Sequence, residues 1–210
     1  MKNILLVLLS LIMIVSCSNS EVVTTDETAK APTVPITAEV RTVNGVVIKE
    51  GLAYAYLEST PYTGKVVKFY ADGSLKETST YKDGKLNGIS EGYFDNGQLE
   101  WRQPFKDGKE VGTYESYYEN GQLDFRMTFK DGKADGLLEW YYEDGQLMTV
   151  STEKDGIEDG LYETYHENGQ LKERTTYKDG EREGTFEIFN QYGRLKSKCF
   201  YENGQEVNCE

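Results

Sequence analysis

The sequence predicts an all-β protein: an elongated antiparallel meander of β-hairpins built from six 24-residue repeats. Gly64 recurs at every 24th residue as far as Gly184, and Leu75 recurs with the same step as far as Leu195. Each repeat carries two Asn-Gly or Asp-Gly turn signals, except that Tyr192 takes the first place of one pair in the sixth. Such pairs between short aromatic-rich runs favour hairpin turns, and a fixed period of this length indicates a row of similar supersecondary units.

The first element of the chain is a short apolar leader. A basic residue precedes an apolar run of 12 residues from Ile4 to Val15, and Cys17 follows after one small residue. A helix needs about 20 apolar residues to span a bilayer, so residues 1–16 are predicted to be a secretory signal peptide. The ending resembles the bacterial lipoprotein signal, in which cleavage leaves Cys17 first and its thiol carries the lipid. The alternative is a signal without lipidation, in which this cysteine is incidental.

Residues 17–40 are predicted to be a flexible tether. They are rich in Ser, Thr, Glu, Ala and Pro and contain no aromatic residue. Such a segment cannot bury enough apolar surface to offset the entropy of ordering it. Residues 41–63 follow as a β lead-in to the repeats.

Residues 64–210 hold the repeats. No stretch among them shows the sustained 3.6-residue apolar period of a helix. Turn signals 11 to 13 residues apart leave strands of about seven to nine residues. The six units follow one another without a gap: 64–87, 88–111, 112–135, 136–159, 160–183 and 184–207.

The register of each hairpin can be tested on the sequence. A two-residue Asn96-Gly97 turn sets Glu91 opposite Arg102 and Gly92 opposite Trp101. Opposite charges and large–small pairs are favoured between cross-strand neighbours, so we expect two-residue turns throughout. The same rule sets similar pairs in later units: Glu115 with Arg126, Glu163 with Arg174, Glu187 with Lys198, and, as the exception, Glu139 with Val150.

This register sorts the side chains onto two faces. The recurrent Leu residues and the Tyr81 series are expected on one face, which is the predicted core face. The other face is expected to carry the Glu–Arg pairs and one aromatic residue per hairpin, here called the aromatic stripe: Phe69, Tyr93, Tyr117, Tyr141, Tyr165 and Phe189. Because Tyr suits wet interfaces, the stripe is predicted to bind a partner. The alternative is that its rings only stack along the sheet.

Charge and composition exclude several classes of function. The chain has 23 Lys and Arg against 36 Asp and Glu, a formal net charge of −13, which excludes phosphate-driven nucleic-acid binding. One His and three Cys leave little material for metal or nucleophile chemistry. His166 stands where the first four units have an aromatic residue and the sixth has Asn190. The Asp-Gly pairs lack the ligand spacing of calcium loops. We therefore predict no catalytic site, no metal and no cofactor.

Cys199 and Cys209 form a candidate disulfide, because thiols of exported chains pair by default. They flank Asn203-Gly204. A two-residue turn there would set Cys199 opposite Asn208 and point Cys209 to the other face, so a bridge needs a bulge or a three-residue turn. Both outcomes stay open.

The repeat unit resembles the MORN-repeat variant family of bacteria. Residues 112–132, GTYESYYENGQLDFRMTFKDG, carry the resemblance, and Pro61-Tyr62-Thr63-Gly64 looks like the lead-in of the subset labelled YwqK-type antitoxins. The resemblance implies a β-hairpin meander. For function it implies a scaffold or, for that subset, an antitoxin of a toxin–antitoxin pair.

We therefore predict a non-enzymatic lipoprotein, exported and lipid-anchored in the bacterial cell envelope, at the outer membrane or the cell surface. Its repeats are expected to act as a scaffold for a protein partner. The alternatives are a carbohydrate-binding module for cell-wall glycan, since exposed Tyr and Trp rings stack on sugars, and an antitoxin-like protein. Membrane contact is expected only through the lipidated N-terminus.

Overall fold

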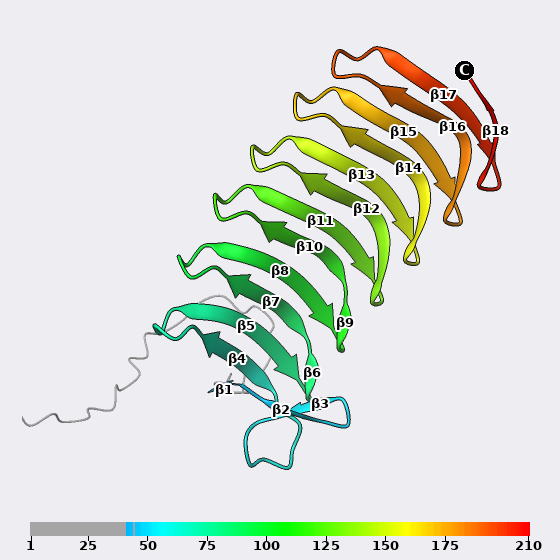
Figure 1. The fold of residues 1–210 in the computed structure, drawn as a ribbon. Coiled ribbons are helices and arrows are strands. Elements are labelled where there is room, and N and C mark those ends of the chain that lie inside the picture. The colour runs from blue at the N-terminus through cyan, green and yellow to red at the C-terminus, as the bar shows by residue number, and fades with distance from the viewer. Residues whose placement is uncertain (1–40, 44) are drawn as a thin grey trace, which may run out of the picture. The chain divides into compact units, whose positions relative to one another are not determined.

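The computed structural model describes residues 41–43 and 45–210, which fall within one compact unit, Ala38–Glu210 (Figure 1). The predicted all-β fold is confirmed, and the described residues contain no helix. The predicted signal peptide, Cys17 and the tether lie outside the described residues.

One long sheet contains the repeats as an antiparallel meander, each strand pairing with the next along the chain (Figure 1). Short strands β6 (Lys85–Leu86) and β9 (Lys109–Glu110) pair with the ends of their preceding strands. The strands of the six units are β4 (Gly64–Phe69), β5 (Leu75–Lys82), β7 (Gly88–Tyr93), β8 (Leu99–Lys106), β10 (Gly112–Tyr117), β11 (Leu123–Lys130), β12 (Lys133–Tyr141), β13 (Leu147–Lys154), β14 (Ile157–Tyr165), β15 (Leu171–Lys178), β16 (Glu181–Phe189) and β17 (Leu195–Glu202).

The predicted cross-strand pairs are confirmed. Glu91 lies opposite Arg102, and Gly92 lies opposite Trp101. Gly92 is required there, because a Cβ at this position would overlap the indole of Trp101. The later pairs also hold: Glu115 with Arg126, Glu139 with Val150, Glu163 with Arg174, and Glu187 with Lys198.

The predicted two-residue turns at the Asn-Gly pairs are wrong. In the second unit the Phe94 N–H donates to the Gln98 carbonyl at 2.9 Å, and the Gly97 N–H donates to the Phe94 carbonyl at 3.0 Å. These bonds close a three-residue loop with Gly97 in the left-handed region at φ 85°. Glu100 then forms a β-bulge that shifts the register between the Gly92 and Tyr93 pairs. The longer loop shifts the pairing by one residue, and the extra residue in the bulge shifts it back. The strand pairs from Gly92 and Trp101 onward are therefore those that a two-residue turn would give.

The bulge overturns the predicted separation of the Leu residues from the aromatic stripe. Residues directly opposite each other in an antiparallel pair share a face. Every stripe residue lies opposite a recurrent Leu: Phe69 with Leu75, Tyr93 with Leu99, Tyr117 with Leu123, Tyr141 with Leu147, Tyr165 with Leu171, and Phe189 with Leu195. Stripe and Leu row therefore lie side by side on one face, here called the stripe face.

The Asp-Gly turns are two-residue turns, as predicted. Asp107 and Gly108 have φ angles of 52° and 85°, which type I′ turns require. The Gly108 N–H also donates to the carbonyl of Leu86 in the preceding unit at 2.8 Å. Equivalent bonds link the following units along this edge of the sheet.

In the later units the Gly64 series lies where a strand changes register against the last strand of the preceding unit. In β12 the register against β11 shifts beyond Met127, and Gly136 lies in the shifted segment at φ 135°. A Cβ there would lie 3.0 Å from the Cβ of Thr128. Glycine at this place lets the strand continue after the shift without a clash.

The lead-in takes the place of a preceding unit at the start of the sheet. β1 (Arg41–Val43) pairs in parallel with β4, and β2 (Val47–Lys49) pairs with β3 (Leu52–Tyr54) as a separate hairpin. The Gly84 N–H donates to the Tyr62 carbonyl at 2.8 Å, as later turn glycines donate to the unit before them. A repeat array needs such a cap, because each unit contacts mainly its neighbours.

At the other end, β18 (Gln205–Cys209) pairs with β17. The register shifts between Phe200 and Tyr201, so Cys199 lies opposite Cys209 rather than Asn208. The structure joins the two cysteines in a disulfide. The sequence did not decide whether a bulge forms there. The structure has one, at Val207.

The predicted core face is not a buried core. The hydrophobic core of the described residues is a small cluster of Ala55, Tyr62 and Val66 beside the lead-in. The recurrent Leu residues are half-buried, and Leu195 is 51% exposed. The described residues form no second layer over the repeats, so both faces of the sheet are open to solvent.

Candidate functional site

The aromatic stripe lies on strands β4, β7, β10, β12, β14 and β16, next to the Asn-Gly loops. Its rings are half-buried, apart from Phe69, which is 49% exposed. Three of its hydroxyls donate to the Glu two residues earlier, for example Tyr165 to Glu163 at 2.6 Å. Burial, together with the bond to this carboxylate, raises the pKa of Tyr165 to about 12. These bonds give a structural reason for Tyr in the stripe.

Beside the stripe runs a row of ion pairs. Arg102 lies 3.3 Å from Glu91, and Arg174 lies 2.6 Å from Glu163. Where Val150 leaves Glu139 without a cation opposite, Glu139 pairs instead with Arg126 of the strand on its other side, at 3.3 Å. The more exposed pairs, such as Arg102 with Glu91, contribute little to stability, so their main effect is the chemistry of this surface, whereas Glu163 is buried.

In three of the six units the stripe face also carries an exposed aliphatic residue, which was not predicted; the other three units have Lys65, Thr113 and Thr185 at this position. Ile89, Leu137 and Leu161 are 44%, 51% and 45% exposed. Each follows the first glycine of its unit and stands two residues before a Glu of the ion-pair row, which puts it on the same face. The position after that glycine was the available signal in the sequence.

The opposite face carries aromatic residues that sequence analysis did not single out. Trp101, Tyr114 and Phe125 line a hollow of about 430 Å³ over the second and third units. The Phe125 ring packs at 4.3 Å from that of Trp140, which is 39% exposed. This face therefore presents both Trp rings of the chain.

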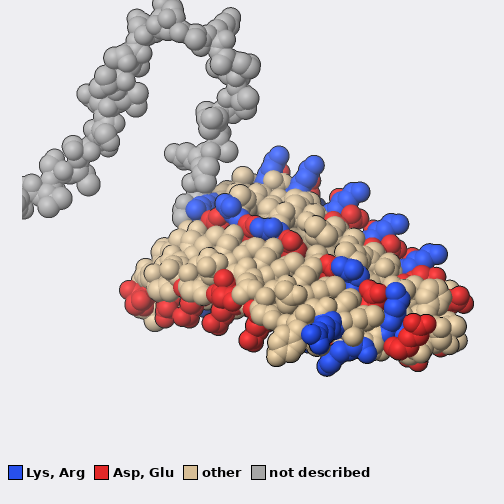
Figure 2. All heavy atoms as spheres, turned by 90° about the horizontal axis from the view of Figure 1, so that it is seen from above, with Lys and Arg blue, Asp and Glu red and all other residues tan. Residues whose placement is uncertain are grey.

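The two turn edges of the sheet differ in charge (Figure 2). A Lys precedes each Asp-Gly turn, and in the first three units a Lys also follows it, as in Lys82-Asp83-Gly84-Lys85. The Asn-Gly loops contain acidic residues and no Lys or Arg within their central three positions in the first five units. In Figure 2 a row of Lys and Arg with interleaved acids follows the upper edge, and acids without Lys or Arg follow the left part of the lower edge.

A ladder of hydrogen bonds ties the Asn-Gly loops of neighbouring units together. Tyr118 donates its hydroxyl proton to the Tyr141 carbonyl at 2.7 Å, and Tyr70 and Tyr142 make the same bond at their own junctions. At the fifth junction the Nε2 atom of His166 lies 3.2 Å from the Phe189 carbonyl oxygen. The only His thus occupies a place in this ladder.

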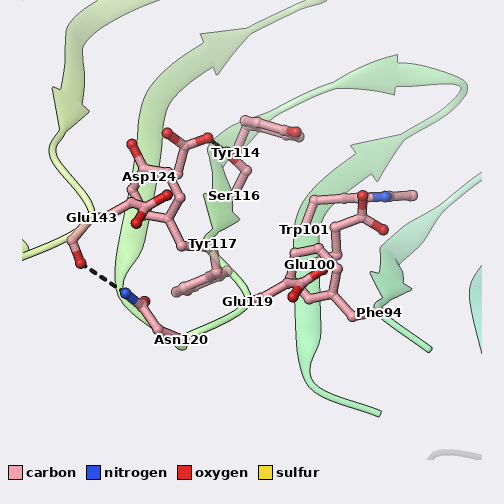
Figure 3. A pocket seen from close by; sticks show the side chains of 11 residues that line it. Phe94, Glu100, Trp101, Tyr114, Ser116, Tyr117, Glu119, Asn120, Asp124 and Glu143 are labelled. Carbon is pink, nitrogen blue, oxygen red and sulfur yellow. Dashed lines mark hydrogen bonds between the residues drawn. The ribbon is translucent and has the colours of Figure 1, made fainter. Parts of the chain in front are cut away.

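The ladder is interrupted between the second and third units, where Phe94 replaces the Tyr. A pocket of about 570 Å³ opens at this junction. Figure 3 shows Phe94, Glu100 and Trp101 on one side of it and Asp124 and Glu143 on the other. Its aromatic lining is Phe94, Trp101, Tyr114, Tyr117 and Tyr118, and its acidic lining is Glu100, Glu119, Asp124 and Glu143.

The MORN repeat variant family matches five segments of the chain: 62–83, 86–107, 110–131, 134–152 and 158–179. The chain belongs to this family. The matched segments of the MORN repeat variant coincide with the first five hairpins. The sixth unit, 184–207, is not matched, yet it forms the same strand pair, β16 and β17. MORN repeats build a repeat scaffold, and this is the function class that the family supports.

Other comparisons add no functional argument. No curated protein matches the chain. Among solved structures, a chain described as "Crystal structure of GtfA/B complex bound to UDP and GlcNAc" is similar at 11% identity and a TM-score of 0.25. The match covers 64% of this chain and 27% of that one, so this chain spans about a quarter of the length of the solved chain. No helix among the described residues is long and apolar enough to cross a membrane.

Proposed function

We propose that this MORN repeat variant is a non-enzymatic scaffold of the bacterial cell envelope that binds a protein partner through the stripe face. The observation that supports it is the composition of that face: a row of ion pairs and the paired stripe and Leu rows run in parallel along one open side of the sheet, and three units add an exposed aliphatic residue.

This combination has the chemistry of a recognition surface. A sheet face of this kind is ordinarily covered by a second layer, and none covers it among the described residues. Exposed aliphatic side chains such as Leu137 and Leu161 supply apolar contact area. The neighbouring Glu–Arg pairs supply polar contacts around it, as in the rims of protein interfaces.

Site-specific photo-crosslinking tests the proposal. A photoreactive residue at Leu137 or Leu161 is expected to capture the same protein in the native cells, because both positions lie on the stripe face. The matched control is Trp140, which is exposed on the opposite face. Equal capture of that protein from all three positions, or capture from the control alone, would contradict this assignment.

We also propose that a lipid on Cys17 anchors the protein, with residues 17–40 as the tether. This rests on the leader sequence alone. Cys17→Ser is expected to move the protein from the membrane fraction to the soluble fraction, because the acyl chains supply the membrane affinity. Membrane retention of this variant would count against lipidation.

Cell-wall glycan is the second candidate ligand, and the exposed Trp rings favour it. Trp140 is 39% exposed beside Phe125 on the face opposite the stripe, and flat aromatic rings stack on sugar faces. Binding to purified cell wall that falls with Trp140→Ala, and is unchanged with Leu137→Ala, would support this alternative. The antitoxin-like role stays a prediction from the resemblance, and a cytoplasmic location in fractionation would be needed for it.

A further inference from the structure

The pocket between the second and third units is a break in an otherwise regular edge. Phe94 has no hydroxyl with which to bond the Tyr117 carbonyl, the bond that Tyr70, Tyr118 and Tyr142 make at other junctions. The loop Asn also differs. Asn120 donates its amide proton to the Glu143 carbonyl at 2.8 Å, whereas the Asn96 amide contacts its own loop, at Gln98. This junction therefore lacks the Tyr bond and also the loop amide bond that Asn120 and Asn168 make at the third and fifth junctions; the first and fourth units have Asp at that position and lack the amide bond too.

The β-bulge position shows what chemistry the pocket accepts. In the six units this position holds Lys76, Glu100, Asp124, Met148, Lys172 and Lys196. In the first unit, the Lys76 ammonium lies 5.1 Å from the centre of the Tyr70 ring, which is the equivalent of Phe94 and Tyr118. A cation at this distance is attracted by the ring face. The first unit thus supplies its own cation to the ring next to the bulge.

The second and third units reverse this charge. Glu100 and Asp124 stand where Lys76 stands, and both carboxylates line the pocket together with Phe94 and Tyr118. None of the residues lining the pocket is Lys or Arg. The rings that would hold a cation are present and acids surround them, but the residues that line the pocket include no cation.

We propose that this pocket binds an alkylammonium group, from a lysine side chain of a polypeptide or from a small amine. The ammonium would lie against the rings of Phe94 and Tyr118, as Lys76 lies against Tyr70, with Glu100 and Asp124 accepting its hydrogen bonds. A volume of about 570 Å³ is within the usual range of ligand pockets. The inference goes beyond the stripe-face proposal and does not depend on it.

Trp101 lines the pocket and provides the measurement. The full chain carrying Trp140→Phe retains Trp101 as its only Trp. Its fluorescence is followed during titration with a capped peptide that contains one Lys, with the same peptide containing norleucine, and with n-butylammonium, all at physiological salt. We expect a saturable change with the Lys peptide and none with the norleucine peptide. A response to n-butylammonium as strong as that to the Lys peptide would identify a small amine as sufficient, and a weaker one would favour a polypeptide source.

Two variants test the assigned groups. Glu100→Lys restores the residue of the first, fifth and sixth units, so it is compatible with the fold, and it should weaken peptide binding at least about tenfold. The double variant Glu100→Gln/Asp124→Asn keeps the shape of the pocket and should have a similar effect. The control Asp131→Asn/Asp179→Asn removes two charges at the other turn edge, where Asn203 already occupies the equivalent position, and should bind normally.

Three results would overturn the proposal. The first is no response to either ammonium probe at millimolar concentration. The second is equal binding of the norleucine peptide. The third is an equal loss of binding in the Asp131/Asp179 control, since this would mean that the net charge of the chain, rather than the pocket, attracts the cation.

Discussion

Two neighbouring junctions of this sheet differ by two side-chain hydrogen bonds. Between the third and fourth units, Tyr118 and Asn120 each donate a side-chain hydrogen bond to the next unit. Between the second and third units, Phe94 and Asn96 make neither bond, and the pocket opens there. In a repeat array each unit contacts mainly its neighbours. A departure from the repeat can therefore create a site at one junction and leave the pairing of the other units unchanged.

The largest expected effect comes from exchanging the small residues that face the aromatic rings of the two units. Gly92 faces Trp101, whereas Ser116 faces the smaller Phe125. Gly92→Ser would push the Trp101 indole out of its position and should lower the free energy of unfolding by about 1–3 kcal/mol. Ser116→Gly, the matched change in the third unit, meets no such overlap.

Thermal unfolding followed by circular dichroism measures both variants. A loss from Ser116→Gly as large as that from Gly92→Ser would mean that strand propensity, rather than the fit against Trp101, sets the cost. Gly92→Ser should also disturb the pocket, because the displaced indole is part of its lining.

The second effect comes from making the intact junction resemble the interrupted one. Tyr118→Phe removes the hydroxyl that donates to the Tyr141 carbonyl at 2.7 Å. Loss of one such bond should lower the free energy of unfolding by about 1 kcal/mol. The measurement is denaturant unfolding, with Tyr192→Phe, which removes the hydroxyl of a 76% exposed side chain, as the control. An unchanged stability would show that the ladder does not hold neighbouring loops together.

The strands and their pairing could be predicted from the sequence because period, turn signals and cross-strand charges agree. Glu91 opposite Arg102 is an example. The loop geometry could not, because a three-residue loop followed by a bulge at Glu100 produces the same pairs as a two-residue loop from Gly92 onward. The face on which Leu99 lies depends on this difference, and charge pairs farther along the strand carry no information about it.

Of the candidate sites too, one could be predicted from the sequence and the other could not. The stripe was predictable as a row, since a period of 24 residues places its members on successive hairpins. The pocket at Phe94 was not, because its lining comes from loops of adjacent units whose approach depends on bonds such as that of Asn120 to the Glu143 carbonyl. Phe for Tyr is a conservative change in composition, and its consequence appears only once the carbonyl that would accept the hydroxyl proton is placed.

The third effect is the reverse exchange, Phe94→Tyr, which restores the missing hydroxyl. The new hydroxyl should reach the Tyr117 carbonyl, as Tyr70 reaches the Tyr93 carbonyl at 2.7 Å. Stability should rise by less than about 1 kcal/mol, because closing the pocket also removes water from Glu100. Denaturant unfolding measures the gain, and Tyr118→Phe in the same background should reverse it. A loss of stability would mean that the added hydroxyl does not supply the missing bond to the Tyr117 carbonyl.

The smallest expected effect is a loss of stability at alkaline pH that comes from Tyr118 at the intact junction. Burial, followed by the nearby carboxylates of Asp124 and Glu143, raises the pKa of Tyr118 to about 12. An unfolded Tyr has a pKa near 10. A group whose pKa is raised by folding stabilises the folded state below its unfolded pKa, and this contribution is lost as the pH rises through the folded one. Stability should therefore fall between about pH 10 and pH 12, and Tyr118→Phe should show a smaller fall over that range. Ultraviolet titration of the phenol measures the pKa of Tyr118, and denaturant unfolding at each pH measures the free energy of unfolding. An identical pH dependence of stability in wild type and variant would show that the carboxylates at this junction do not act on Tyr118.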